Sequence, residues 1–242
     1  MKVFRIRNKD RIYAYYYVSN NYEYSYIDIV DGLDEYPLFF YMHSDKGKYT
    51  LNEFWTKKWI NERVIPYERQ NINTILKNSN MEYYNENLML IKSKAKSSMD
   101  DNYLEEIKVL DEFNINRRKI LIKDYMKIDD GKIIVFFNNG NSKLYDTKYH
   151  GDDRGFLYPF GNEIIFNQKD RFDYLEIYKN GIDIPFTYDN LINYINSNIL
   201  STKEVMDELS ISKQSVYNLK NRKDIISLKD NMFLLNDIKK NV

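Results

Sequence analysis

Apolar and polar residues alternate over much of the first 42 positions, which is the pattern of β-strands. Residues 11–18 are rich in tyrosine, and residues 24–30 place apolar and polar side chains at alternate positions. The Ser-Asn-Asn cluster at residues 19–21 favours a turn between them. Adjacent strand residues face opposite sides of a sheet, so the tyrosines at 15–17 divide between two faces. We therefore expect them to pack in a core rather than stack on bases.

Helical spacing replaces this alternation after residue 50. Thr50 and Glu53 have the spacing of a capping box, in which each side chain satisfies the other's free backbone N–H. The helix predicted to follow ends at Pro66. Its apolar residues are Phe54, Trp55, Trp59 and Ile60. Ile72, Ile75 and Leu76 predict a second, short helix. Leu104, Ile107, Leu110 and Phe113 predict a third.

From about residue 114 the pattern again favours strands. Residues 132–137 are strongly apolar, and Asn139 with Gly140 predicts a tight hairpin, because both tolerate positive φ. The hairpin leads to a strand at residues 142–146. Residues 172–178 alternate and predict a further strand. A helix is expected from Thr187, with Leu191, Ile192 and Ile195 as its buried positions.

Two short helices separated by a turn are predicted near the end of the chain. Ser201 and Glu204 form a second capping box, which starts a helix at residue 202. Ser210 and Ile211 interrupt it, and Ser212 is the N-cap of the next helix. The apolar residues that brace the pair are Val205, Leu209, Val216 and Leu219. This is the spacing of a helix-turn-helix.

Charge is unequal between these two helices. Residues 202–209 carry Lys203 against three acidic residues, whereas residues 212–223 carry four basic residues and no acid. Residues 225–228 and 232–235 then predict two strands around a polar turn, which is the layout of a wing. The local excess of positive charge in residues 212–223 attracts phosphates. The residues expected to contact DNA are Ser212, Lys213, Gln214, Ser215, Tyr217, Asn218, Lys220, Arg222, Lys223, Lys229 and Asn231.

The same residues resemble a known DNA-binding family. Residues 201–205, 211–219 and 232–238 are similar to the excisionase and MerR-type winged helix-turn-helix. The resemblance implies that the second helix, residues 212–221, enters the major groove. Many members have glycine where this chain has Ser210. If φ is positive there, serine costs about 1 kcal/mol relative to glycine.

Two upstream regions carry other resemblances. Residues 132–140, 155–159, 164–166 and 180–185, with Asp146, resemble a small β-rich domain of unknown function found near toxin–antitoxin modules. Residues 62–72 and 98–103 are similar to a leader segment that precedes HipA-like kinase domains in phage and Firmicute proteins. No phosphate loop or catalytic Asp motif follows, so kinase activity is not implied.

Composition limits the chemistry available to the chain. Its 242 residues include 36 basic and 36 acidic side chains, so any nucleic-acid site must be local. The absence of cysteine excludes thiolate sites, and His43 and His150 alone make a histidine metal site improbable. The run at residues 117–119 is basic and fits a solvated face. No apolar run is long enough to span a bilayer, and we expect a cytoplasmic protein.

Carboxylate pairs are weak candidates for catalysis. The pairs at residues 129–130 and 152–153 lie beside glycines and fit solvated turns, and a third pair lies at residues 100–101. Glu106 and Lys108, with Asp101 upstream, resemble the spacing of a nuclease core. On the helix expected there, positions i and i+2 point apart. We therefore expect no enzyme, no cofactor and no metal.

The fold class expected is α+β, with three domains. Residues 1–112 and 113–197 form two small β-rich α+β domains, and residues 198–242 form the winged helix-turn-helix. The function expected is sequence-specific binding of double-stranded DNA by a homodimeric transcriptional regulator of phage or mobile-element type. The alternative is an anti-CRISPR or other anti-defence inhibitor, or an antitoxin. Such a protein would bind a host defence protein or a toxin through residues 1–197 and repress its own promoter.

Overall fold

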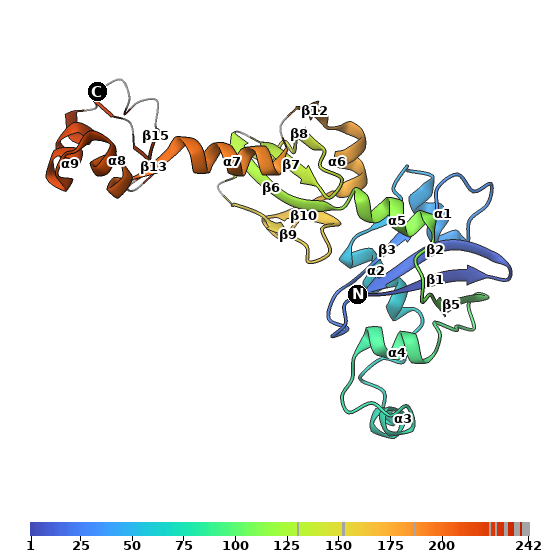
Figure 1. Ribbon diagram of the computed structural model, residues 1–242. Coiled ribbons are helices and arrows are strands. Elements are labelled where there is room, and N and C mark those ends of the chain that lie inside the picture. The colour runs from blue at the N-terminus through green and yellow to red at the C-terminus, as the bar shows by residue number, and fades with distance from the viewer. Residues whose placement is uncertain are drawn as a thin grey trace. The chain divides into compact units, whose positions relative to one another are not determined.

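The computed structural model describes residues 1–129, 131–151, 153–185, 187–222, 224–225, 227–229, 232–234 and 238. The chain divides into two compact units. Unit 1 comprises residues 1–139 and 143–183, and unit 2 comprises residues 140–142 and 184–242. Within the described residues the protein is α+β, with nine helices and several antiparallel sheets (Figure 1). The predicted boundaries near residues 112 and 197 stay predictions.

Unit 1 begins with a five-stranded sheet in the order β4-β3-β2-β1-β5. The strands are β1 (Lys2–Asn8), β2 (Arg11–Val18), β3 (Ser25–Ile29), β4 (Thr50–Leu51) and β5 (Asn102–Glu106). Tyr16 packs with Trp59 on one face, whereas Tyr15 and Tyr17 pack with Tyr26 on the other. The strands predicted at residues 11–18 and 24–30 and the core use of these tyrosines are confirmed, whereas the strand character expected up to residue 42 is wrong for residues 38–42, which are helical.

Four helices follow the first strands, and the first, second and fourth bury Phe40, Trp59 and Leu90 against one face of this sheet. They are α1 (Leu38–Ser44), α2 (Glu53–Asn61), α3 (Ile72–Asn78) and α4 (Glu86–Lys92). The helices predicted after residue 50 and at residue 72 are confirmed, but the Thr50 capping box is wrong. Asn52 is the N-cap of α2, and its side chain accepts the Trp55 N–H at 3.1 Å. Thr50 lies in β4 and donates its hydroxyl to Asp28. α2 also ends at Asn61, five positions before Pro66.

The helix predicted from residue 104 to residue 113 is wrong. Leu104 belongs to β5 and packs against the Trp59 side of the sheet. Phe113 lies in α5 (Glu112–Lys119), packs on the opposite side, and stacks on Tyr15 at 4.8 Å. The helical spacing of these apolar residues therefore spans two elements, a strand and the start of a helix. Asp111 marks the true helix start, because its side chain accepts the Asn114 N–H.

The rest of unit 1 contains two further sheets. Their strands are β6 (Ile122–Asp129), β7 (Lys132–Phe137), β8 (Ser142–Asp146), β9 (Phe156–Leu157), β10 (Glu163–Phe166), β11 (Asp170–Asp173) and β12 (Ile182–Ile184). The orders are β12-β8-β7-β6 and β11-β10-β9. The predicted strands at 132–137 and 142–146 and the turn at Gly140 are confirmed. The chain returns toward β structure only at residue 122, because residues 112–119 are helical.

The strand predicted over residues 172–178 is wrong beyond Asp173. Asp173 accepts the Glu176 N–H at 2.8 Å and starts α6 (Tyr174–Asn180). Tyr174 and Ile177 are buried in the core of the second half of unit 1, three residues apart on one helix face. The Tyr174 hydroxyl also donates to Asp28 of the first sheet at 2.8 Å, so the two halves of unit 1 share a buried polar contact.

Unit 2 contains helices and a small sheet. Its elements are α7 (Tyr188–Asn198), β13 (Ile199–Ser201), α8 (Thr202–Leu209), α9 (Lys213–Arg222), β14 (Ser227–Lys229) and β15 (Met232–Leu234). The helix expected from Thr187 is confirmed, with Thr187 as its N-cap, but Ile192 is exposed rather than buried. The sheet order is β13-β15-β14, and β13 was not predicted. The part of the chain that the structure describes contains no helix long and apolar enough to cross a membrane.

Candidate nucleic-acid interface

The α8–α9 corner is built by local hydrogen bonds that the sequence specifies. Ser201 and Glu204 form the predicted capping box at the start of α8. Ser210 ends α8 in the left-handed conformation, at φ 53° and ψ 41°. Ser210 therefore has the positive φ at which serine is less favourable than glycine. The Ile211 N–H then donates to the Met206 carbonyl at 3.1 Å, which turns the chain toward α9.

The inner face of α9 is fixed by a small apolar core. Val216 is buried together with Val205, Ile225, Phe233 and Ile238. Partly buried side chains surround this core, namely Leu200, Met206, Leu209, Ile211 and Leu219. A single buried stripe on a helix leaves the opposite side to solvent. The core thus determines which residues of α9 face outward.

Ser212 starts α9, as its sequence position predicts. Its hydroxyl oxygen accepts the Ser215 N–H at 3.2 Å, and the two serine hydroxyls lie 3.0 Å apart. The Ser212 carbonyl accepts the Val216 N–H. Both serines therefore have structural contacts at the start of the helix.

Amide side chains occupy the centre of the outer face of α9. With about 100° per residue, Gln214, Asn218 and Asn221 lie within about 40° of the direction opposite Val216. All three are exposed. The Gln214 amide donates to the Asn218 amide oxygen at 3.4 Å. Asn221 was not among the predicted residues. Its helical angle relative to Val216, which the sequence contains, would have identified it.

Positive side chains flank these amides. By the same rule Lys213 and Lys220 lie about 60° and about 40° from Val216, and Arg222 lies about 120° from Val216 in the opposite sense. Lys213 and Arg222 are exposed, and Lys220 is half-buried. Within the described part of unit 2, no ion pair involves any of the three. α9 contains no acidic residue, so the charge of its three cations is not compensated within the helix.

A groove of about 560 Å³ runs along one edge of α9. The end of α8 contributes Glu208 to it, and α9 contributes Asn218 and Arg222. Leu209, Ile211 and Leu219 supply its apolar lining. Asn218 and Arg222 therefore border both the outer face and this groove.

Eight of the predicted DNA-contacting residues lie on α9 or at its N-cap, on one continuous helix. They are Ser212, Lys213, Gln214, Ser215, Tyr217, Asn218, Lys220 and Arg222. Tyr217 is 39% exposed. Lys223 and Asn231 lie outside the described residues. Only the backbone of Lys229 is described, as the last residue of β14.

The catalytic alternatives have a different geometry from the one expected. Glu106 ends strand β5, so the helix argument that separated it from Lys108 does not hold. Glu106, Lys108 and Asp101 are exposed. Among the described residues, no group of three or more His, Asp or Glu side chains could hold a metal ion. Asp153 accepts the backbone N–H groups of Gly155 and Asn167, which fits the turn role expected for it.

His43 lies in an aromatic setting on α1. Its ring lies 4.7 Å from the Trp55 ring and 5.5 Å from the Phe39 ring. Burial, with Lys46 as the next contribution, lowers the pKa of His43. The ring is therefore held neutral as part of a packed cluster.

Comparison of the chain with protein-family models, with curated proteins and with solved structures finds no match.

Proposed function

We propose that the chain is a sequence-specific DNA-binding transcriptional regulator, and that residues 198–242 act as a winged helix-turn-helix. One observation carries this proposal: the solvent-accessible surface of α9 combines amides with cations, and the helix contains no acid. α9 would lie in the major groove, as the second helix of such motifs does.

The two kinds of side chain on α9 suit different parts of DNA. Asparagine and glutamine amides can each make two hydrogen bonds to an adenine edge in the major groove. Gln214 and Asn218 already contact each other through their amides, which restricts their rotamers before binding. Lys213, Lys220 and Arg222 would contact phosphates on either side. The wing formed by β14 and β15 would place its turn against the DNA backbone.

Binding-site selection with the full chain and random duplexes tests this proposal. We expect an enriched motif and, for a dimer, two half-sites about 34 Å apart. Gln214→Ala and Asn218→Ala should each relax the preference at one base pair and cost about 1–3 kcal/mol on the selected site. Lys203→Ala on the acidic helix α8 is the matched control and should leave the motif unchanged. The absence of any enriched motif would contradict the proposal.

A second candidate function, binding of a host protein, is favoured by an apolar stripe on α1. Leu38, Tyr41 and Met42 share one helix face and are 77%, 51% and 47% exposed. Exposed apolar groups that adjoin one another mark interaction sites. If this candidate is correct, a host nuclease complex or toxin should co-purify stoichiometrically with the full chain. Leu38→Asp should abolish that capture, whereas Val109→Asp, also at an exposed apolar position of unit 1, should not.

A further inference from the structure

A second site candidate lies within unit 1, independent of α9. A cavity of about 620 Å³ is lined by residues 46–49, by Asp31 after β3, by Arg117 of α5, by Asp173 of β11 and by residues 175, 176 and 178–180 of α6. This volume is in the range of sites that hold small molecules. Its lining includes four cations and three carboxylates, with few apolar side chains. The cavity therefore suits a polar, charged ligand.

Arg117 is the unusual member of this lining. It was expected on a solvated face, but it is only 9% exposed. Its guanidinium lies 4.8 Å from the Phe113 ring centre, and its Nη2 has no hydrogen-bond acceptor among the residues that the structure describes. The nearest carboxylate oxygen recorded for Nη2 is Asp31 Oδ1 at 3.5 Å, too long for a well-formed hydrogen bond. A buried guanidinium in this state is costly unless an anion completes its hydrogen bonds.

The fully buried Asp28 does not supply that anion. Its Oδ1 accepts the Thr50 hydroxyl at 2.8 Å and its Oδ2 accepts the Tyr174 hydroxyl at 2.8 Å. No hydrogen bond or ion pair between Asp28 and Arg117 is recorded in the described residues. Asp28 therefore compensates the charge of Arg117 through space while leaving its donors available.

The remaining charges around the cavity favour an anionic ligand. Two of its carboxylates already accept protein donors: Glu176 accepts the Tyr145 hydroxyl at 2.8 Å, and Asp173 accepts the Glu176 N–H. Lys46, Lys48 and Lys179 are exposed, and none of them has an ion pair within the described part of unit 1. Because the hydrogen-bonded carboxylates keep their charge, the four cations of the lining exceed its three carboxylates by one.

We propose that this cavity binds a small phosphorylated molecule with hydroxyl groups, of the sugar phosphate class. The phosphate is held by Arg117 and by Lys48 and Lys179, and it displaces the Asp31 carboxylate, whose side chain is 59% exposed and free to move outward. Arginine suits this task because its planar fork matches two phosphate oxygens. The hydroxyls of the ligand donate to the lone pairs of Glu176 and Asp173 that the protein's own donors leave free. The proposal does not depend on DNA binding by unit 2.

Isothermal titration of the full chain with ribose 5-phosphate tests the proposal, with inorganic phosphate and ribose as comparisons. We expect one saturable site for ribose 5-phosphate, weaker binding of inorganic phosphate and no binding of ribose. Lys48→Ala and Lys179→Ala should each weaken binding about fivefold, and Asp31→Asn should strengthen it about fivefold, because a repulsive charge is removed. Arg117→Lys should weaken it more than tenfold.

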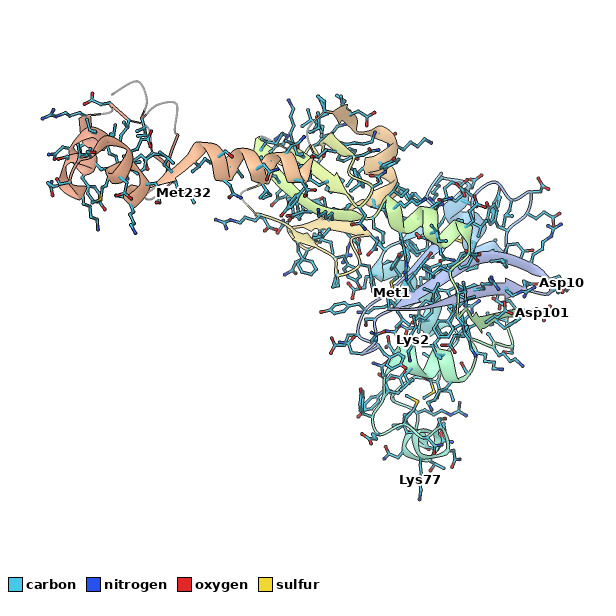
Figure 2. All side chains as sticks on the ribbon, in the orientation of Figure 1. Met1, Lys2, Asp10, Lys77, Asp101 and Met232 are labelled. Carbon is cyan, nitrogen blue, oxygen red and sulfur yellow. The ribbon has the colours of Figure 1, made fainter. Side chains whose placement is uncertain are left out.

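Lys77→Ala is the matched control. Lys77 is an exposed lysine of unit 1 on α3, which contributes nothing to the cavity lining (Figure 2). The affinity of the Lys77→Ala variant for ribose 5-phosphate should equal that of the unmodified chain. Because Lys48, Lys179 and Asp31 lie at the surface, their variants keep the test valid even if Arg117→Lys fails to fold. The proposal is overturned if neither phosphate compound gives a saturable site, if Lys77→Ala weakens binding equally, or if Asp31→Asn weakens it.

Discussion

The salt dependence of DNA binding gives a quantitative test of the outer face of α9. The helix carries three cations, at Lys213, Lys220 and Arg222, with no acid among its residues. Each phosphate contact contributes about 0.9 to the slope of log affinity against log salt. Three contacts give a slope of about −2.7, so raising salt from about 50 to about 200 mM weakens binding roughly 40-fold through α9 alone. Lys213→Ala removes one contact, which leaves a slope of about −1.8 and a roughly 12-fold loss over the same range.

Fluorescence anisotropy with a labelled duplex, measured at four or more salt concentrations, determines this slope. The sequence of the duplex comes from the binding-site selection, and the unmodified chain is measured beside each variant. Lys203→Ala, a lysine of the neighbouring acidic helix, should leave the slope unchanged. A slope that is identical in the unmodified chain, Lys213→Ala and Lys220→Ala would refute the assignment of α9 to the phosphate backbone, whatever the affinity.

Three further predictions concern stability. Ser210→Gly should raise the free energy of unfolding of unit 2 by about 1 kcal/mol, because serine is strained at φ 53°; a lower melting temperature would contradict this. Val216→Ala should lower the same free energy by about 2 kcal/mol, since it removes buried methyl groups, and a change within error would mean that α9 is not packed through this face. Burial raises the pKa of Asp28 to about 6. The folded state therefore binds the carboxyl proton of Asp28 more tightly than the unfolded chain does. The contribution of Asp28 to the free energy of unfolding consequently falls as pH rises from about 4 to above 6. Denaturant titrations should therefore show Asp28→Asn gaining stability relative to the unmodified chain across that interval, and a pH-independent difference would show that Asp28 ionises normally.

Local signals in the sequence predicted the elements whose boundaries are set by local chemistry. The capping box at Ser201 and Glu204, the helix end at Ser210 and the hairpin at Gly140 all depend on residues within a few positions of one another. For the same reason, strands β7 and β8 were predicted with the bounds that the structure has.

The wrong predictions arise where one apolar pattern runs through residues that tertiary packing assigns to different elements. Leu104 and Phe113 are spaced as if on one helix, yet they pack on opposite faces of the first sheet. The alternation at residues 172–178 continues past Asp173, whose capping hydrogen bond starts a helix instead. Strand β13 has only three residues and forms through pairing with β15, more than 30 positions later, which no local pattern reveals.

The two candidate sites also differ in whether they could be predicted from the sequence. The face of α9 follows from one buried position, Val216, and the helical period, so its residues could be predicted from the sequence. The cavity of unit 1 could not, because it brings together Asp31, Arg117 and α6, which are separated by long stretches of chain. In the sequence, Arg117 is part of the basic run at residues 117–119. Only its surroundings in the folded structure distinguish it from the other residues of that run.

The position of β15 between β13 and β14 has a consequence during protein synthesis. Phe233 of β15 and Ile238 belong to the core that supports α9, and β13, which precedes both helices, pairs with β15. While a ribosome is still translating residues before 232, the sheet lacks its central strand and the core lacks two of its five buried side chains. A nascent chain therefore cannot present the assembled helix pair until those last residues have emerged, which delays any activity of α9 until translation has passed them.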